Sequence, residues 1–203
     1  PLVEDVARSA RKLAGHDLVP FSDDPLPAGE LRRVFTHRPR AQYQVLLAKG
    51  EHLSGELTAL QHAHITSGSL AVVVTPSGKI LGSVTAEIGV PGAIEMVAPE
   101  DGVYAIAITS GRAKGRLRLD NRYVCIAGPR VTLVGDQTSA YLAPKAGAAA
   151  IDLNVISYVP GEHVQVTLRT PDGTVAVDGN TRDECPFKVH GVANGREAWR
   201  LDL

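Results

Sequence analysis

Leu70-Ala-Val-Val-Val-Thr-Pro-Ser-Gly78 and Val164-Gln-Val-Thr-Leu-Arg-Thr-Pro-Asp-Gly173 are two stretches of the same kind. Each begins with a β-branched run that is typical of a strand and ends in Thr-Pro-x-Gly. Proline presets φ at the second position of a turn and glycine follows the polar residue, so the chain reverses there. Each stretch therefore predicts a β-hairpin, whose second strand is residues 79–84 in the first case and 174–177 in the second.

The similarity continues beyond the turns at a constant spacing of 95 residues. Both copies end in a strand in which large apolar side chains alternate, so these side chains share one face and are core candidates. The single tryptophan, Trp199, falls in this strand, and we expect it to be buried rather than to stack on a sugar. The matched positions are Ile94 with Val189, Val97 with Val192, Ala98 with Ala193, Tyr104 with Trp199, Ile106 with Leu201 and Ile108 with Leu203.

The repeat predicts an all-β protein of two tandem antiparallel β-sandwich domains, jelly-roll-like in organisation. Apolar segments alternate with turn signals about every ten residues, as in a sandwich or barrel. The 20 glycines and 13 prolines suit many tight turns. We expect three segments: a short helix (Val3–Ala14) with a proline-rich linker in residues 1–30, a first sandwich in residues 31–134 and a second in residues 135–203.

The start of the repeat is less regular. Phe35–Gly50 resembles Tyr141–Asn154 in pattern, and the first copy then carries extra residues that include Gly50–Gly55. We expect a loop or an added strand pair to emerge there. Residues 111–134 have no counterpart in the second copy before Leu203, where the given sequence stops, so they either complete the first sandwich or link the two domains. Because a function should be sought where the copies differ, Glu51–His64 is the first segment to consider.

Both copies contain Pro-x-Gly before an apolar strand and close on an aromatic residue that begins an alternating strand. In the second copy these features lie in Tyr141–Gly147, Pro171–Val175 and Gly195–Leu201, and in the first in Pro76–Gly78 and Pro99–Ile106. In this respect each copy resembles the bacterial pre-peptidase C-terminal domains and similar accessory domains of secreted multi-domain hydrolases. The resemblance implies an extracellular or periplasmic, non-catalytic module, and it transfers no functional residues.

The charge and hydropathy of the chain exclude two classes of partner. With 21 basic and 22 acidic residues, the net charge of −1 gives no large field for polyanions, so nucleic acid is not expected as the main partner. The apolar runs are too short to span a membrane. Arg116-Leu-Arg-Leu119 alternates as a half-buried strand does, with its arginines facing solvent. The two cysteines, Cys125 and Cys185, form either one disulfide or two buried thiols.

Two groups of residues are candidate metal ligands. His62 and His64 would lie on one face of an extended segment and could bind zinc with a third ligand, although solvent-exposed loop histidines are the alternative. Asp172, Asp178 and Asp183 supply oxygen ligands across two turns and could hold a structural calcium ion, although such residues are also common turn formers.

The sequence contains no motif that predicts catalysis. We find no Gly-x-Ser-x-Gly, P-loop or Rossmann glycine pattern, and no motif that sets a serine or cysteine beside a base. The leading hypothesis is a non-catalytic accessory pair that needs no cofactor and contacts adjacent domains of the same polypeptide, as a spacer, stabiliser or substrate-targeting unit. The alternatives are a carbohydrate-binding or calcium-dependent adhesion module and, last, a hydrolase that uses His62 and His64.

Overall fold

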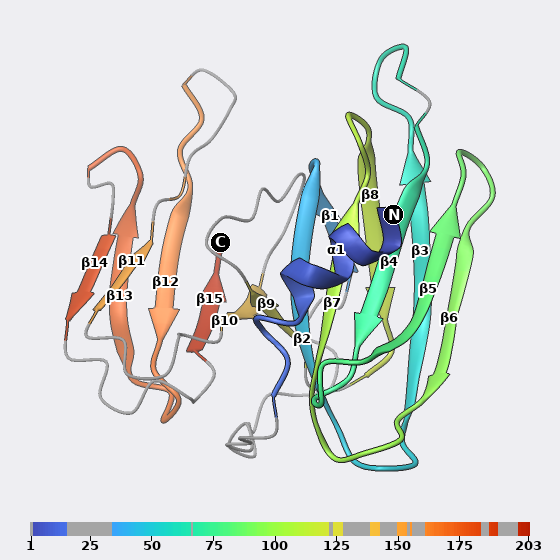
Figure 1. The fold of residues 1–203 in the computed structure, drawn as a ribbon. Coiled ribbons are helices and arrows are strands. Elements are labelled where there is room, and N and C mark those ends of the chain that lie inside the picture. The colour runs from blue at the N-terminus through green and yellow to red at the C-terminus, as the bar shows by residue number, and fades with distance from the viewer. Residues whose placement is uncertain are drawn as a thin grey trace. The chain divides into compact units, whose positions relative to one another are not determined.

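The protein is mostly β, with one short N-terminal helix, which confirms the predicted fold class (Figure 1). The computed structural model describes residues 2–15, 34–65, 67–121, 124–127, 139–142, 150–153, 155, 161–183, 187–190 and 199–203. The helix, α1 (Leu2–Ala10), ends before the predicted Ala14, and residues 11–13 form a turn. No helix in the described ranges is long and apolar enough to cross a membrane.

The chain divides into two compact units, whose described strands run up to Ala127 in unit 1 and from Ser139 onward in unit 2. Unit 1 contains two antiparallel sheets that share a core. The rings of Phe35 and Tyr43, one from each sheet, lie 5.0 Å apart. One sheet has the order β1 (Val34–His37), β8 (Lys114–Leu119), β3 (His52–Leu60), β6 (Gly92–Val97). The other has the order β9 (Val124–Ala127), β2 (Arg40–Leu47), β7 (Gly102–Thr109), β4 (Ser69–Val74), β5 (Ile80–Ala86).

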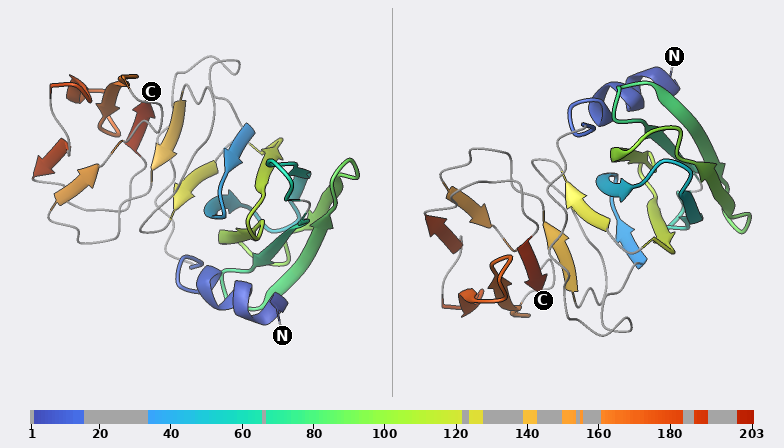
Figure 2. Two further views of the ribbon diagram at one scale, coloured as in Figure 1. Left: turned by 90° about the horizontal axis from the view of Figure 1, so that it is seen from above. Right: turned by 90° about the horizontal axis from the view of Figure 1, so that it is seen from below.

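Strand β4 is buried along its whole length, because both of its faces are covered. Side chains alternate along a strand, so Ala71 and Val73 lie on one face of β4, and the other face carries Leu70, Val72 and Val74. The latter three pack with Ala7 and Ala10 of α1 and with Ala105 and Ala107 of β7. Figure 1 shows α1 lying across β4 and β7, and Figure 2 shows it at the periphery of this unit. The amphipathic helix therefore covers the outer face of the β4–β7 sheet.

Unit 2 repeats this plan with fewer strands in its described part. One sheet has the order β13 (Val175–Asn180), β12 (Gln165–Arg169), β15 (Trp199–Asp202), β10 (Ser139–Leu142), and β11 (Ala150–Leu153) pairs with β14 (Phe187–His190). The buried residues Leu168, Phe187 and Trp199 form its core with Val166, Val189 and Leu201. Trp199 is only 7% exposed, so the prediction that it is a core residue is confirmed.

The two predicted hairpins have the same geometry. The amide of Thr75 donates to the carbonyl of Lys79 at 2.8 Å, and that of Thr170 donates to Thr174 at 2.9 Å. Gly78 and Gly173 have φ of 83° and 85°, a left-handed conformation that glycine adopts without strain. The register also shifts at equivalent positions, between Val73 and Val74 and, 95 residues later, between Leu168 and Arg169.

Strand pairing corrects the predicted start of the repeat. Val45 pairs with Tyr104, and Leu142 pairs with Trp199, so the counterpart of Val45 is Leu142 and the match of Phe35–Gly50 to Tyr141–Asn154 is wrong. No insertion emerges at Gly50–Gly55: residues 48–51 form a tight turn, and β3 begins at His52. Short apolar strands fit several registers equally well, so the sequence pattern does not align the starts of the two copies.

The described part of residues 111–134 supplies strands β8 and β9 of unit 1. Strand β8 lies between β1 and β3, and β9 pairs with β2. Arg116 and Arg118 are exposed while Leu117 and Leu119 are buried, which confirms the predicted alternation. The described part of residues 111–134 therefore completes the first sandwich.

The role of α1 as the cover of β4 can be tested by exchanging equivalent residues between the two copies. Val72 is fully buried under α1, whereas its counterpart 95 residues later is the partly exposed Thr167. Changing Val72→Thr buries a hydroxyl without a partner and should lower the free energy of unfolding by about 1–3 kcal/mol, as measured by urea denaturation. The control Thr167→Val should change it by no more than about 0.5 kcal/mol. Equal effects would contradict the assignment of α1 as the cover of β4.

Candidate functional site

The outer face of the unit 2 sheet is the counterpart of the face that α1 covers in unit 1. The residues 95 positions after Leu70, Val72 and Val74 are Gln165, Thr167 and Arg169, and those after Ala105 and Ala107 are Arg200 and Asp202. Every apolar residue under the helix is thus replaced by one that hydrogen-bonds or carries a charge. We call Gln165, Thr167, Arg169, Asp178, Arg200 and Asp202 the polar face.

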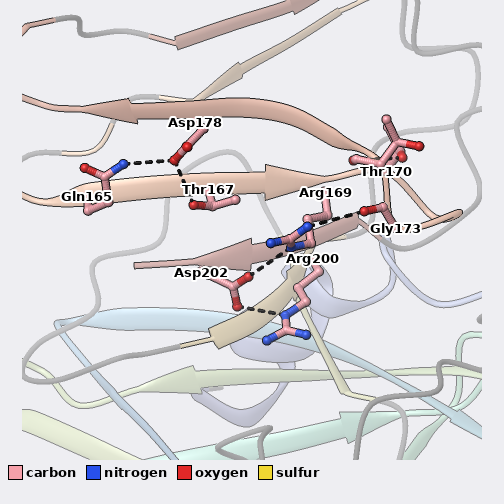
Figure 3. Close-up of polar contacts among 9 residues, drawn as sticks. Gln165, Thr167, Arg169, Thr170, Gly173, Asp178, Arg200 and Asp202 are labelled. Carbon is pink, nitrogen blue, oxygen red and sulfur yellow. Dashed lines mark hydrogen bonds and ion pairs between the residues drawn. The ribbon is translucent and has the colours of Figure 1, made fainter.

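Strand pairing brings the side chains of the polar face together. Thr167 pairs with Asp178 on one side and with Asp202 on the other, and cross-strand partners point to the same side of a sheet. Gln165 Nε2 and Thr167 Oγ1 both donate to Asp178 Oδ1, at 2.9 and 3.2 Å. Figure 3 shows these side chains directed toward one another from β12 and β13.

A second group on the polar face is centred on the carboxylate of Asp202. Arg200 Nε donates to Asp202 Oδ1 at 2.7 Å, and Arg169 Nε lies 3.7 Å from Asp202 Oδ2 (Figure 3). Arg169 Nη1 also donates to the carbonyl of Gly173 at 3.4 Å, which ties the β12 side chain to the hairpin turn. The two ion pairs are partly exposed, so they orient the side chains more than they stabilise the fold.

The polar face is balanced in charge and rich in both donors and acceptors. Its two arginines are offset by Asp178 and Asp202, and Gln165 and Asp178 are exposed. An amide, a hydroxyl, two carboxylates and two guanidiniums stand on one flat sheet surface. Such a surface can hydrogen-bond a polar, uncharged ligand, but it has no strong attraction for either sign of charge.

The predicted zinc ligands lie in a turn rather than on an extended strand. The amide of Ile65 donates to the carbonyl of His62 at 2.9 Å, and Ala63 between them has φ of 51°. His64 is exposed at this turn. The expectation that His62 and His64 share one face of an extended segment is therefore wrong.

The three aspartates proposed for calcium occupy different parts of unit 2. Asp172 caps the hairpin turn: it accepts from Thr170 Oγ1 and from the amide of Thr174, and these hydrogen bonds lower its pKa. Asp178 lies within β13, and Asp183 lies in the turn after the far end of that strand. Within the described ranges, no three His, Cys, Asp or Glu side chains gather closely enough to hold a metal ion.

A buried polar cluster links the two sheets of unit 1. His37, at the end of β1, is fully buried, and its Nε2 lies 3.4 Å from Ser110 Oγ while its Nδ1 lies 3.5 Å from Tyr43 Oη. Ser110 Oγ is in turn 2.8 Å from Ser69 Oγ. A Cβ atom at Gly115 would come within 2.4 Å of Ser110 Oγ and 2.6 Å of His37 Nε2, so only glycine fits there.

His37 and Ser110 bring a base close to a hydroxyl group, and the sequence did not predict this contact. The two residues are 73 positions apart, so no local motif could show their proximity. Both are fully buried, and a substrate needs access to such a pair to react. The geometry supports a structural role, in which neutral polar groups hydrogen-bond one another between the two sheets.

Burial strongly shifts the pKa of His37 and of the Cys125 thiol in unit 1. Desolvation lowers the pKa of His37 to about 4, with a smaller opposing contribution from a hydrogen bond to the backbone of Phe35. Desolvation also raises the pKa of the Cys125 thiol well above its ordinary value. Cys125 is a free, buried thiol on β9, and a buried neutral thiol is a poor nucleophile. Cys185 lies outside the described residues, as do the Pro-rich linker and Gly195.

Comparison of the chain with protein-family models, with curated proteins and with solved structures found no match.

The buried histidine predicts a specific loss of stability in acid. An unfolded histidine has a pKa near 6.5, and the folded His37 has a pKa of about 4, so folding disfavours its protonation. Its contribution to stability is fully present above about pH 6.5 and is lost as the pH falls toward 4, by roughly 3 kcal/mol in total. Urea denaturation between pH 7.5 and pH 4 should show this loss.

The variant His37→Gln should lack this part of the pH dependence, because it removes the titrating group, whatever its effect on stability at pH 7.5. The variant His64→Gln, which changes an exposed histidine, is the control and should keep the pH profile of the original chain. An unchanged profile in His37→Gln would show that other groups cause the acid sensitivity.

Proposed function

We propose that this chain is a non-catalytic accessory pair of β-sandwich modules from a larger secreted protein, and that the polar face of its second copy binds a polysaccharide. The observation that carries the proposal is the exchange at equivalent positions of the repeat. Where the first copy has Leu70, Val72 and Val74 under a helix, the second has Gln165, Thr167 and Arg169 on a partly exposed surface.

The two copies accordingly divide their roles. Unit 1 fills both faces of its β4–β7 sheet with apolar contacts, as a stabilising scaffold would. Unit 2 keeps the hairpin and the core positions but turns hydrogen-bonding groups outward. This division supports a substrate-targeting role for unit 2 and a spacer or stabiliser role for unit 1.

The chemistry of the polar face favours a neutral, hydroxyl-rich ligand. Sugar hydroxyls both donate and accept, and the amide of Gln165 and the carboxylate of Asp178 provide the complementary groups. The near-neutral charge balance argues against a charged ligand at this face. The resemblance of both copies to accessory domains of secreted hydrolases supports an extracellular or periplasmic setting and neighbouring domains in the same polypeptide.

A binding experiment tests this proposal. The 203-residue chain is incubated with insoluble cellulose, chitin and xylan, with and without a chelator, and the bound fraction gives a dissociation constant. The triple variant Gln165→Ala/Arg169→Ala/Asp178→Ala removes three polar side chains with no net change of charge. We expect it to bind at least about tenfold more weakly, since each lost hydrogen bond costs about 0.5–1.5 kcal/mol.

The matched control is Ser83→Ala/Glu95→Ala/Lys188→Ala, which also removes one acidic, one basic and one neutral side chain from exposed positions. It should bind as the original chain does, and both variants should keep their circular dichroism spectra. The proposal fails if no polysaccharide retains the chain, or if the control loses as much affinity as the triple variant. Release of soluble sugar by the purified chain would contradict its non-catalytic part.

A further inference from the structure

The outer face of the other unit 1 sheet carries a group of basic side chains that have no acidic neighbours across the strands. On β8, Arg116 pairs with Thr36 of β1 and with Thr58 of β3. Lys114, two residues earlier on the same face, pairs with Leu60. Arg38 directly follows the end of β1, and both Arg38 and Lys114 act electrostatically on the ring of His62. We call Arg38, Lys114 and Arg116 the basic strip.

The third basic residue of β8 differs from these. Arg118 pairs with Glu56 across the strands, and its Nη1 lies 3.8 Å from Asp120 Oδ1. Within the described residues, no ion pair joins Arg38, Lys114 or Arg116 to a carboxylate. Charge compensation is therefore present at one end of β8 and missing at the other.

The charges of the basic strip affect a neighbouring imidazole. The pKa of His62 is lowered chiefly by desolvation and further by Coulombic repulsion from Arg38 and Lys114, so both cations lie near its ring. Like charges that lie close together repel one another. A bound anion would offset this repulsion.

We propose that the basic strip binds an anionic polysaccharide, a glycan that carries carboxylate or sulfate groups. Residues two apart on a strand are separated by roughly 6.7 Å, so Lys114 and Arg116 present two cations in a row along β8, as repeated anionic groups on an extended polymer require. Thr36 and Thr58 flank Arg116 on both sides; Thr58 Oγ1 donates to Glu56 Oε1 at 3.2 Å, and the hydroxyl of Thr36 can hydrogen-bond a sugar hydroxyl.

Charge distribution limits this site to a few anionic groups of a ligand. The strip holds three cations, and the same face continues into Glu56, Glu95 and Asp120, so the positive region is short. The net charge of the chain is −1. This site is independent of the polar face, because it lies in the other unit and uses charge rather than neutral hydrogen bonding.

The experiment uses soluble polymers in place of the insoluble neutral ones. Binding of the full chain to polygalacturonate and to dextran sulfate is measured by calorimetry in 50 mM and 300 mM salt, with uncharged dextran as the reference. We expect binding to at least one of the anionic polymers and weaker binding at the higher salt, because salt screens exposed charges. We expect no binding to uncharged dextran.

The variant Arg38→Gln/Lys114→Gln/Arg116→Gln should bind at least tenfold more weakly. Its unfolding midpoint should be unchanged or raised, because like charges are removed. The control Lys79→Gln/Arg182→Gln/Lys188→Gln removes the same charge from exposed positions elsewhere and should stay within twofold of the original chain.

Three outcomes would overturn the inference: no binding to either anionic polymer, equal losses in the two triple variants, or tighter binding to duplex DNA or to anionic vesicles than to the glycans. The polar-face variant Gln165→Ala/Arg169→Ala/Asp178→Ala should leave this binding intact. Failure at the basic strip and failure of the proposed function can thus be told apart.

Discussion

The apolar face that Leu70, Val72 and Val74 present away from the sandwich core is the constraint on which unit 1 depends. A sheet with apolar residues on both faces must have a layer on each side, because exposed apolar area is unfavourable at about 25 cal/mol per Å². The opposite sheet covers one side. Helix α1 covers the other with Ala7 and Ala10, whose small side chains let the helix lie close to the strands.

The same constraint explains why the second copy can expose its sheet. Its inward residues remain apolar at the equivalent positions, as Leu168 and Trp199 show, so its core needs no change. Its outward residues alternate with them and contact no core side chain, so they can be polar without loss of packing. Divergence between the copies therefore accumulates on the outward face, where it changes surface chemistry and leaves the hairpin intact.

The sequence predicted those parts of the fold that depend on local chemistry. The Thr-Pro-x-Gly turns, the buried Trp199 and the alternation of Arg116 with Leu117 follow from turn geometry and period-2 patterning, and the structure confirms them. The start of the repeat was misaligned because short apolar strands fit several registers equally well. The contact of His37 with Ser110 depends on the packing of one sheet on the other, which no local pattern records.

The polar face lies where the two copies differ, although not in the segment Glu51–His64 that the sequence favoured. The polar face arises by substitution on strands that the copies share. The basic strip lies on β8 and just after the end of β1 in unit 1. The polar face is a neutral hydrogen-bonding surface, whereas the basic strip carries charge that no ion pair among the described residues compensates. A duplicated fold can thus acquire two surfaces of different chemistry while one hairpin and one core pattern maintain its stability.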